Sequence, residues 1–276
     1  MELPSWLQSF LMQICDSIFA IIPQQAPTLE NLCKCKIISH RGQHDNITVF
    51  ENTLSAFDHA LETAGIWGIE LDFRWTKDLH PVVAHDPDLR RLFGSNVRIA
   101  ETTLAELKQH CPQVPTLKEV LLRYGGKVHL MVEAKEEYYP QPEKQNMILK
   151  DLFAPLKPRE DFHLLSLDPK MLVLVKFVDN SAKIPVAVFN AKTLSKISLN
   201  EKYAGLGGHY LLLHKRIVKQ HLDCGQKIGV GYPNSKNNLF REINRGVEWI
   251  FSNDAVKLCH IIQTELDKTR SNIYTN

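Results

Sequence analysis

The sequence predicts an α/β fold, a closed (β/α)8 TIM barrel of parallel strands with a short helical extension at its N-terminus. Short apolar runs alternate with helical patterns from residue 36 onward, and they give about nine strand candidates, close to the eight of such a barrel. An open doubly wound sheet would usually carry a glycine-rich phosphate loop after its first strand, and none follows here. No repeat or linker divides the chain. We therefore expect one barrel domain over residues 36–270, preceded by an extension over residues 1–35.

The N-terminal extension has the pattern of an amphipathic helix. Phe10, Ile14, Ile18 and Ile22 recur at every fourth position, which places them on one helical face. Polar residues interrupt the run too often for a membrane span, and no basic segment precedes it as in a secretory signal. We expect this helix to pack on the barrel. Peripheral membrane contact through residues 6–22 is the alternative.

The expected strands are runs rich in apolar residues that end at turn residues or at polar motifs. The pattern of the run at 210–213 is the weakest. In chain order the strands are expected over residues 36–39, 67–73, 81–84, 127–134, 162–165, 184–189, 210–213, 227–230 and 247–251.

The expected helices have apolar residues three or four positions apart and recognisable ends. Gly65 follows the first of them, and Asp168-Pro169 has the residues of a helix N-cap and first turn. In chain order the helices are expected over residues 51–64, 103–110, 117–124, 143–156, from 169, 215–222 and 236–244.

Composition narrows the classes of partner. The chain has 276 residues, 44% of them hydrophobic, and a formal net charge of +2, so nothing indicates a nucleic-acid partner. The six cysteines lack the spacing of a disulfide framework or a zinc site, which predicts free thiols in a reducing compartment. We expect a cytoplasmic protein, with membrane association as the alternative that the N-terminal helix allows.

Three carboxylates predict a site for a divalent cation. Glu70 and Asp72 are two residues apart on one strand and so share a face, and Glu133 ends another strand. An inward carboxylate at the carboxyl end of a barrel strand is costly unless a cation compensates it. Oxygen ligands favour Mg²⁺ or Ca²⁺. The structural alternative is an ion pair with a neighbour such as Arg74.

Two histidines and two cations complete the predicted site. His40 and His85 each follow a strand and stand beside a charged residue, so they are candidates for a general acid and a general base. Arg41 and Lys135 would supply positive charge to a phosphate. The motif Glu51-Asn52-Thr53 has two interpretations, a plain helix N-terminus or a group that orients His40 or binds phosphate.

These motifs resemble the glycerophosphodiester phosphodiesterase family in order and spacing. The matching motifs are HRG at 40–42, ENT at 51–53, ELD at 70–72, TKD at 76–78, VVAHD at 82–86 and VEAK at 132–135. The resemblance implies a (β/α)8 barrel that uses a divalent metal cation to cleave small glycerophosphodiesters into glycerol 3-phosphate and an alcohol. It further implies these roles: acid/base catalysis by His40 and His85; metal binding by Glu70, Asp72 and Glu133; substrate binding by Arg41, Lys135 and Asn52.

The chain departs from the family pattern near its C-terminus. Residues 229–234 replace the usual aromatic strand end, and we expect Tyr232 to take the place of the aromatic pocket wall. This departure bears on substrate choice more than on reaction type. Two other functions stay open: a phospholipase D-like or cyclising lyase that acts on lysophospholipids, and a barrel that binds a phosphorylated ligand without turnover.

Overall fold

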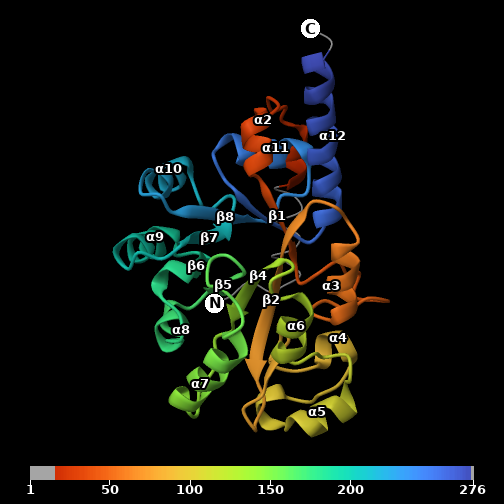
Figure 1. Ribbon diagram of the computed structural model, residues 1–276, viewed down its shortest axis with the longest axis vertical. Helices are drawn as coiled ribbons and strands as arrows, with labels where there is room; N and C mark the ends of the chain where they lie inside the picture. Colours follow the sequence, from red (N-terminus) through yellow and green to blue (C-terminus); the bar gives the residue numbers. More distant parts are fainter. Residues whose placement is uncertain (1–15, 275–276) are drawn as a thin grey trace.

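A computed structural model describes residues 16–274 and confirms the predicted barrel (Figure 1). Eight parallel strands close on themselves in the order β1-β9-β8-β7-β6-β5-β4-β2, and β2 pairs with β1. The strands are β1 (Lys36–His40), β2 (Ile66–Trp75), β4 (His129–Ala134), β5 (Phe162–Ser166), β6 (Lys183–Ala187), β7 (Gly205–His209), β8 (Lys227–Gly231) and β9 (Trp249–Ser252).

Helices surround the strands on the outside of the barrel (Figure 1). Threonine side chains cap several of them, as Thr53 does for α3 and Thr116 for α6. The helices are α2 (Leu29–Lys34), α3 (Leu54–Leu61), α4 (Arg90–Phe93), α5 (Leu104–His110), α6 (Leu117–Tyr124), α7 (Pro142–Phe153), α8 (Pro169–Leu174), α9 (Ala191–Asn200), α10 (Lys215–Asp223), α11 (Lys236–Asn244) and α12 (Ala255–Tyr274), with 3₁₀ turns η1 (Ile99–Glu101) and η2 (Asn180–Ala182).

The alternation predicted for β2 is present. Ile69 and Leu71 pack outward in the core between strands and helices, whereas Glu70 and Asp72 occupy the intervening positions on the barrel side. A smaller apolar cluster fills the barrel interior and includes Met131. The barrel side of β2 therefore carries its charges at the carboxyl end of the strand.

The expected strand at 81–84 is not a barrel strand, which corrects the sequence interpretation. It is β3 (Pro81–Val83), and it pairs antiparallel with the overlong β2. The chain runs out past the rim along β2 and returns along β3, so that the Ala84 N–H donates to the Asp72 carbonyl at 3.0 Å. This hairpin returns His85 to the rim that the parallel strands form.

The sixth barrel strand also lies elsewhere than predicted. It is β7, at Gly205–His209, while residues 210–213 form the turn that follows it. Glycine is disfavoured in strands, so the sequence Gly-Leu-Gly-Gly gives little strand signal. The structure supplies the reason for glycine, because a Cβ on Gly205 would collide with the backbone carbonyl of Lys227 on β8.

The described end of the N-terminal segment packs on the barrel. The Asp16 carboxylate accepts hydrogen bonds from the backbone of Asn234 and from the side chain of Asn238 in α11. The Phe19 ring packs edge-on against Tyr210 with centroids 5.7 Å apart. Ile18 and Ile21 on the same segment are exposed. The earlier part of the predicted helix, including Phe10 and Ile14, lies outside the described residues.

The residues that the structure describes include no helix with the length and apolar character needed to cross a bilayer.

We predict that Gly205→Ala lowers the free energy of unfolding by about 1–3 kcal/mol, as for other overpacked sites. Urea denaturation measures the change. Gly231→Ala is the matched control, because its nearest neighbour, the Cβ of Phe251, would lie 4.0 Å away. An equal loss in the two variants would contradict the close approach of β7 to β8.

Candidate active site

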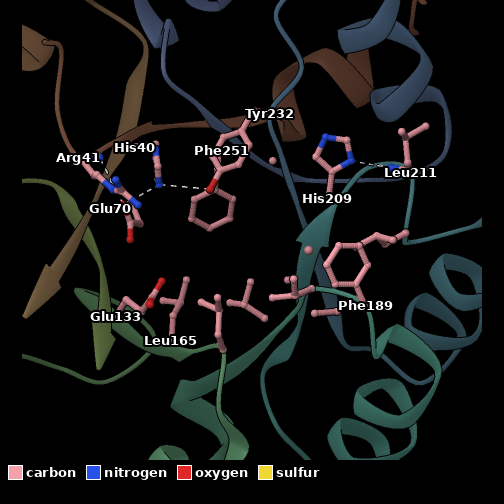
Figure 2. A pocket seen from close by; sticks show the side chains of 18 residues that line it. His40, Arg41, Glu70, Glu133, Leu165, Phe189, His209, Leu211, Tyr232 and Phe251 are labelled. Carbon is pink, nitrogen blue, oxygen red and sulfur yellow. Dashed lines mark hydrogen bonds and ion pairs between the residues drawn. The ribbon is translucent and has the colours of Figure 1, made fainter. Parts of the chain in front are cut away.

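A pocket of about 430 Å³ opens at the carboxyl ends of the barrel strands. His40, Arg41, Glu70 and Glu133 lie together in one part of it, and Figure 2 shows Phe189 and Leu211 at the opposite end. The chain reaches this rim after β1 through Arg41 and Gly42, both with left-handed backbone angles. Gly42 is required there because a Cβ would lie 2.6 Å from the backbone of Ala56 in α3.

The three predicted metal ligands meet in the structure. Glu70, Asp72 and Glu133 are buried, and each offers an oxygen within 4.8 Å of the others. Arg41 Nε lies 3.1 Å from Asp72, and Lys135 Nζ lies 2.6 Å from Glu133 and 3.3 Å from Asp72. Two cations thus face three carboxylates, which leaves negative charge uncompensated in a buried site.

The pKa shifts of the carboxyl groups differ, and they show which group resists ionisation. Burial and the neighbouring Asp72 raise the pKa of Glu70 well above its usual range. Burial also opposes ionisation of Asp72, but Arg41 and Lys135 outweigh it and hold the pKa of Asp72 well below normal. A hard cation among these oxygens would stabilise the charged form of Glu70. The donor set therefore fits Mg²⁺ or Ca²⁺.

His40 is held in one tautomer. Its Nδ1 lies 2.6 Å from Oδ1 of Asn253, and since an amide oxygen only accepts, Nδ1 carries the hydrogen. The other nitrogen, Nε2, accepts from the Tyr232 hydroxyl at 3.2 Å and lies 3.7 Å from Glu70. Burial and the charge of Arg41 lower the pKa of His40 to about 3, so the ring is neutral and Nε2 carries no hydrogen.

His85 lies in a different setting, beside the main pocket and half-buried. Its Nδ1 is 2.7 Å from Asp86, and the Asp86 carboxylate is 2.6 Å from Arg91. Arg91 also pairs with the buried Glu51 at 2.7 Å, and Glu51 pairs with Arg41 at 3.0 Å. A continuous chain of charges therefore connects His85 to the carboxylate cluster.

Arg74 forms no ion pair with the strand carboxylates. The alternative that it neutralises them is therefore wrong. Its Nη1 donates to Glu137 at 3.3 Å, and its Nε donates to the backbone carbonyl of His85 at 2.8 Å. Arg74 thereby helps to place His85.

The Glu51-Asn52-Thr53 motif begins α3, as the first of its two interpretations predicted. Thr53 caps α3, as a plain helix start requires. Asn52 directs both ends of its amide at Asp72, donating to Oδ2 at 2.8 Å and accepting from the Asp72 N–H at 3.3 Å. Asn52 thus touches a candidate metal ligand, while its predicted contact with substrate stays a prediction.

Sequence reasoning missed Asn253 and Arg91 as members of the site. Asn253 follows the last barrel strand, so its place at a strand end was a usable signal. No sequence signal pointed to Arg91. It lies five residues after Asp86 in the short helix α4, and its contact with Glu51 depends on the tertiary fold.

Comparison with known proteins agrees with this geometry. Residues 40–222 match the model of the glycerophosphoryl diester phosphodiesterase family. The chain belongs to this family. The resemblance predicted from the motifs is confirmed, and the matched range covers both histidines and all three carboxylates of the site.

Individual members of the family differ in how much of the chain they match. A glycerophosphodiester phosphodiesterase of Caldanaerobacter subterraneus is 34% identical over 42% of this chain and 52% of its own length. The chain spans about half the length of the first curated relatives it matches. A glycerophosphodiester phosphodiesterase of Bacillus subtilis is 25% identical over 90% of this chain and 94% of its own length.

A solved structure matches over nearly its whole length. The glycerophosphodiester phosphodiesterase of Thermotoga maritima superposes with a TM-score of 0.66 at 26% identity, covering 81% of this chain and 96% of that one. The barrel is therefore that of other members of the family.

We predict that cation binding displaces a proton from Glu70. Because the pKa of Glu70 is raised, this carboxyl is protonated in the metal-free protein over part of the acidic range. Affinity for Ca²⁺ or Mg²⁺ therefore falls as the pH falls. Titration calorimetry in buffers of different ionisation enthalpy measures the released proton.

Glu70→Gln removes this proton release, whereas the exposed Glu160→Gln keeps it and serves as the control. Binding heats that are independent of the buffer in the wild-type protein would show that no proton leaves.

Proposed function

We propose that this protein is a metal-dependent phosphodiester hydrolase that cleaves glycerophosphodiesters into glycerol 3-phosphate and an alcohol. The observation that supports this proposal is the buried group of Glu70, Asp72 and Glu133, which lies in contact with the cations Arg41 and Lys135 and beside a neutral histidine, His40. Membership of the family supports the substrate class. A barrel that only binds phosphate would have no need of a histidine held in one tautomer.

Glu70, Asp72 and Glu133 would hold the divalent cation. Such an ion neutralises the non-bridging oxygens of a phosphodiester and the charge that develops on them during attack. Arg41 and Lys135 already lie beside the same carboxylates, so a phosphate bound there meets their positive charge as well.

His40 acts as the general base in this proposal. A water molecule gives its proton to Nε2 of His40 as its oxygen bonds to phosphorus, because Nδ1 already carries a hydrogen toward Asn253. The Tyr232 hydroxyl donates to Nε2 in the structure, so the water would take the place of that hydroxyl at the ring nitrogen. Asn253 is a positioning residue, since it fixes the tautomer without contact to the reacting atoms.

His85 acts as the general acid. The bond between phosphorus and the leaving alcohol breaks, and the alcohol oxygen takes a proton from Nε2 of His85. Asp86 accepts from the other ring nitrogen and stabilises positive charge on the ring, as a carboxylate does for histidine in other acid/base sites.

The test is release of glycerol 3-phosphate from glycerophosphocholine, glycerophosphoethanolamine and glycerophosphoinositol with Mg²⁺ or Ca²⁺. EDTA should abolish the activity. His40→Ala and His85→Ala should each lower kcat by about 10²–10⁴, the usual contribution of an acid or base. The exposed His110→Ala is the control and should keep wild-type turnover.

Three results would contradict the proposal or part of it. No release from any of these substrates would remove the hydrolase activity, and a cyclic phosphate product, seen by phosphorus NMR, would favour a cyclising lyase. Turnover of His40→Ala at the wild-type rate would remove the role given to His40.

We also propose a cytoplasmic protein that contacts membranes peripherally through residues 6–22. Within the described part of this segment, Ile18 is 51% and Ile21 78% exposed while Asp16 and Phe19 face the barrel. An apolar face directed away from the docked side supports in-plane membrane contact. The free state of Cys33, Cys35, Cys111, Cys224 and Cys259 supports a reducing compartment.

Sedimentation with phosphatidylcholine vesicles tests the membrane contact. Ile18→Asp/Ile21→Asp should reduce the vesicle-bound fraction at least tenfold, because each buried isoleucine contributes about 1.5–3 kcal/mol. Leu122→Asp, at an apolar side chain of α6 that is 72% exposed, is the control. Vesicle binding that the double variant leaves unchanged would refute the contact.

A further inference from the structure

A second pocket, of about 880 Å³, lies at the opposite end of the barrel from the carboxylate cluster. It opens at the amino ends of the strands, where β1, β8 and β9 begin. None of the residues proposed above for catalysis or metal binding lines it. We call it the amino-end pocket and define it by six of its lining residues: Lys36, Trp67, Arg159, Lys202, Lys227 and Trp249.

The charged residues that line the amino-end pocket are all basic. They are Lys36, Arg159, Lys202 and Lys227, and no described aspartate or glutamate lines the pocket with them. Lys227 is neutralised by Glu248, whose carboxylate lies 2.7 Å from its Nζ. Within residues 16–274, the other three cations form no ion pair. The pocket therefore holds positive charge that these described residues leave unpaired.

The lack of an ion-pair partner matters most for Lys36. Its side chain is half-buried, and its Nζ lies 4.4 Å from the centroid of the Trp67 ring. Burial lowers the pKa of Lys36, Glu248 partly offsets that effect, and Lys227 adds to it. An anion in the pocket would stabilise the charged form of Lys36, because an opposite charge nearby favours ionisation.

The inner wall of the amino-end pocket is aromatic and uncharged. Trp67 stacks on His129 with ring centroids 4.2 Å apart, and His129 Nε2 lies 2.8 Å from His163 Nδ1. His163 packs edge-on against Trp249. Burial lowers the pKa of His129 to about 4 and that of His163 to about 3, so both rings are neutral. The positive charge of the pocket therefore comes from its lysines and its arginine.

Neutral donors also line the amino-end pocket. They are the side chains of Ser181, Asn200 and Gln220, and none of them is engaged in a side-chain hydrogen bond with another described residue. Phosphate oxygens accept hydrogen bonds from all of these groups and from lysine and arginine. The volume is about twice the 430 Å³ of the candidate active site, so there is room for more than one phosphate group.

We propose that the amino-end pocket binds a soluble small molecule that carries two or more phosphate groups. Three cations without an ion-pair partner call for a ligand with several negative charges. The concave shape favours a small molecule over an extended polymer. The proposal is independent of the hydrolase function, because the ligand binds at the end of the barrel where no reaction is assigned.

Calorimetric titration of the full chain with inorganic pyrophosphate tests the proposal. The titration contains no divalent metal, because the metal would itself bind pyrophosphate. Arg159→Gln/Lys202→Gln removes two exposed charges from the pocket. We expect this double variant to raise the Kd for pyrophosphate about tenfold, as for the loss of two exposed charge pairs.

Lys192→Gln/Arg216→Gln is the matched control. It removes the same two residue types from exposed positions in the first turns of α9 and α10, outside the pocket, and it should keep the wild-type Kd. Gln220→Glu is an independent variant that places a negative charge at the exposed side of the pocket, and it should also raise the Kd. Thermal unfolding without ligand shows that each variant is folded.

The outcomes are distinct. A loss of affinity confined to the double variant and Gln220→Glu supports the pocket. No binding to the wild-type protein, or the same Kd in the wild type and both pocket variants, overturns the proposal. An equal loss in the control overturns it too, because the anion then responds to overall charge.

Sedimentation with phosphatidylcholine vesicles that contain phosphatidylinositol bisphosphate is the second arm. Vesicle binding that Arg159→Gln/Lys202→Gln abolishes, in a protein that does not bind free pyrophosphate, would assign the pocket to a lipid head group and overturn the soluble ligand. Binding of pyrophosphate without binding of these vesicles supports the soluble ligand.

Discussion

Asp72 sits where the charges of the site meet, and it is fully buried. Arg41 and Lys135 both pair with it, and both amide atoms of Asn52 are bonded to it. These partners keep Asp72 ionised, and burial together with the charge of Asp72 raises the pKa of Glu70. The site therefore carries a carboxyl group that resists ionisation until more positive charge arrives. A bound divalent cation would stabilise the ionised cluster, and without one the raised pKa favours the protonated form of Glu70. The fold therefore creates a site that favours cation binding.

The surrounding elements bring the other charged residues of the site to the carboxylate cluster. The β2–β3 hairpin extends the strand that carries Glu70 and Asp72 and then returns His85 to the same rim. Arg91 and Glu51 continue the charge network from Asp86 to Arg41, so the two histidine motifs share one electrostatic system. Apolar side chains such as Leu165, Val186 and Phe189 line the rest of the pocket, next to the glycines of β7.

The sequence predicted the barrel and the carboxylate group because both depend on local pattern: apolar runs of strand length, and two acids at a period of two. It misplaced β7, because the close approach of Gly205 to β8 is a tertiary requirement that opposes strand propensity. It predicted a parallel strand at β3, because a run of three apolar residues does not indicate whether a strand is parallel or antiparallel to its neighbour. The role of Arg91 depended on a contact with Glu51, 40 residues away, so no single segment of the sequence could show it.

The most direct measurement is a crystal structure of the protein soaked with Mn²⁺, with the ion located by anomalous scattering. The account predicts one peak about 2.0–2.6 Å from an oxygen of each of Glu70, Asp72 and Glu133. Arg41 and Lys135 should remain within reach of a phosphate beside that ion. The absence of a peak there, with the three carboxylates still satisfied by Arg41 and Lys135 alone, would contradict the account.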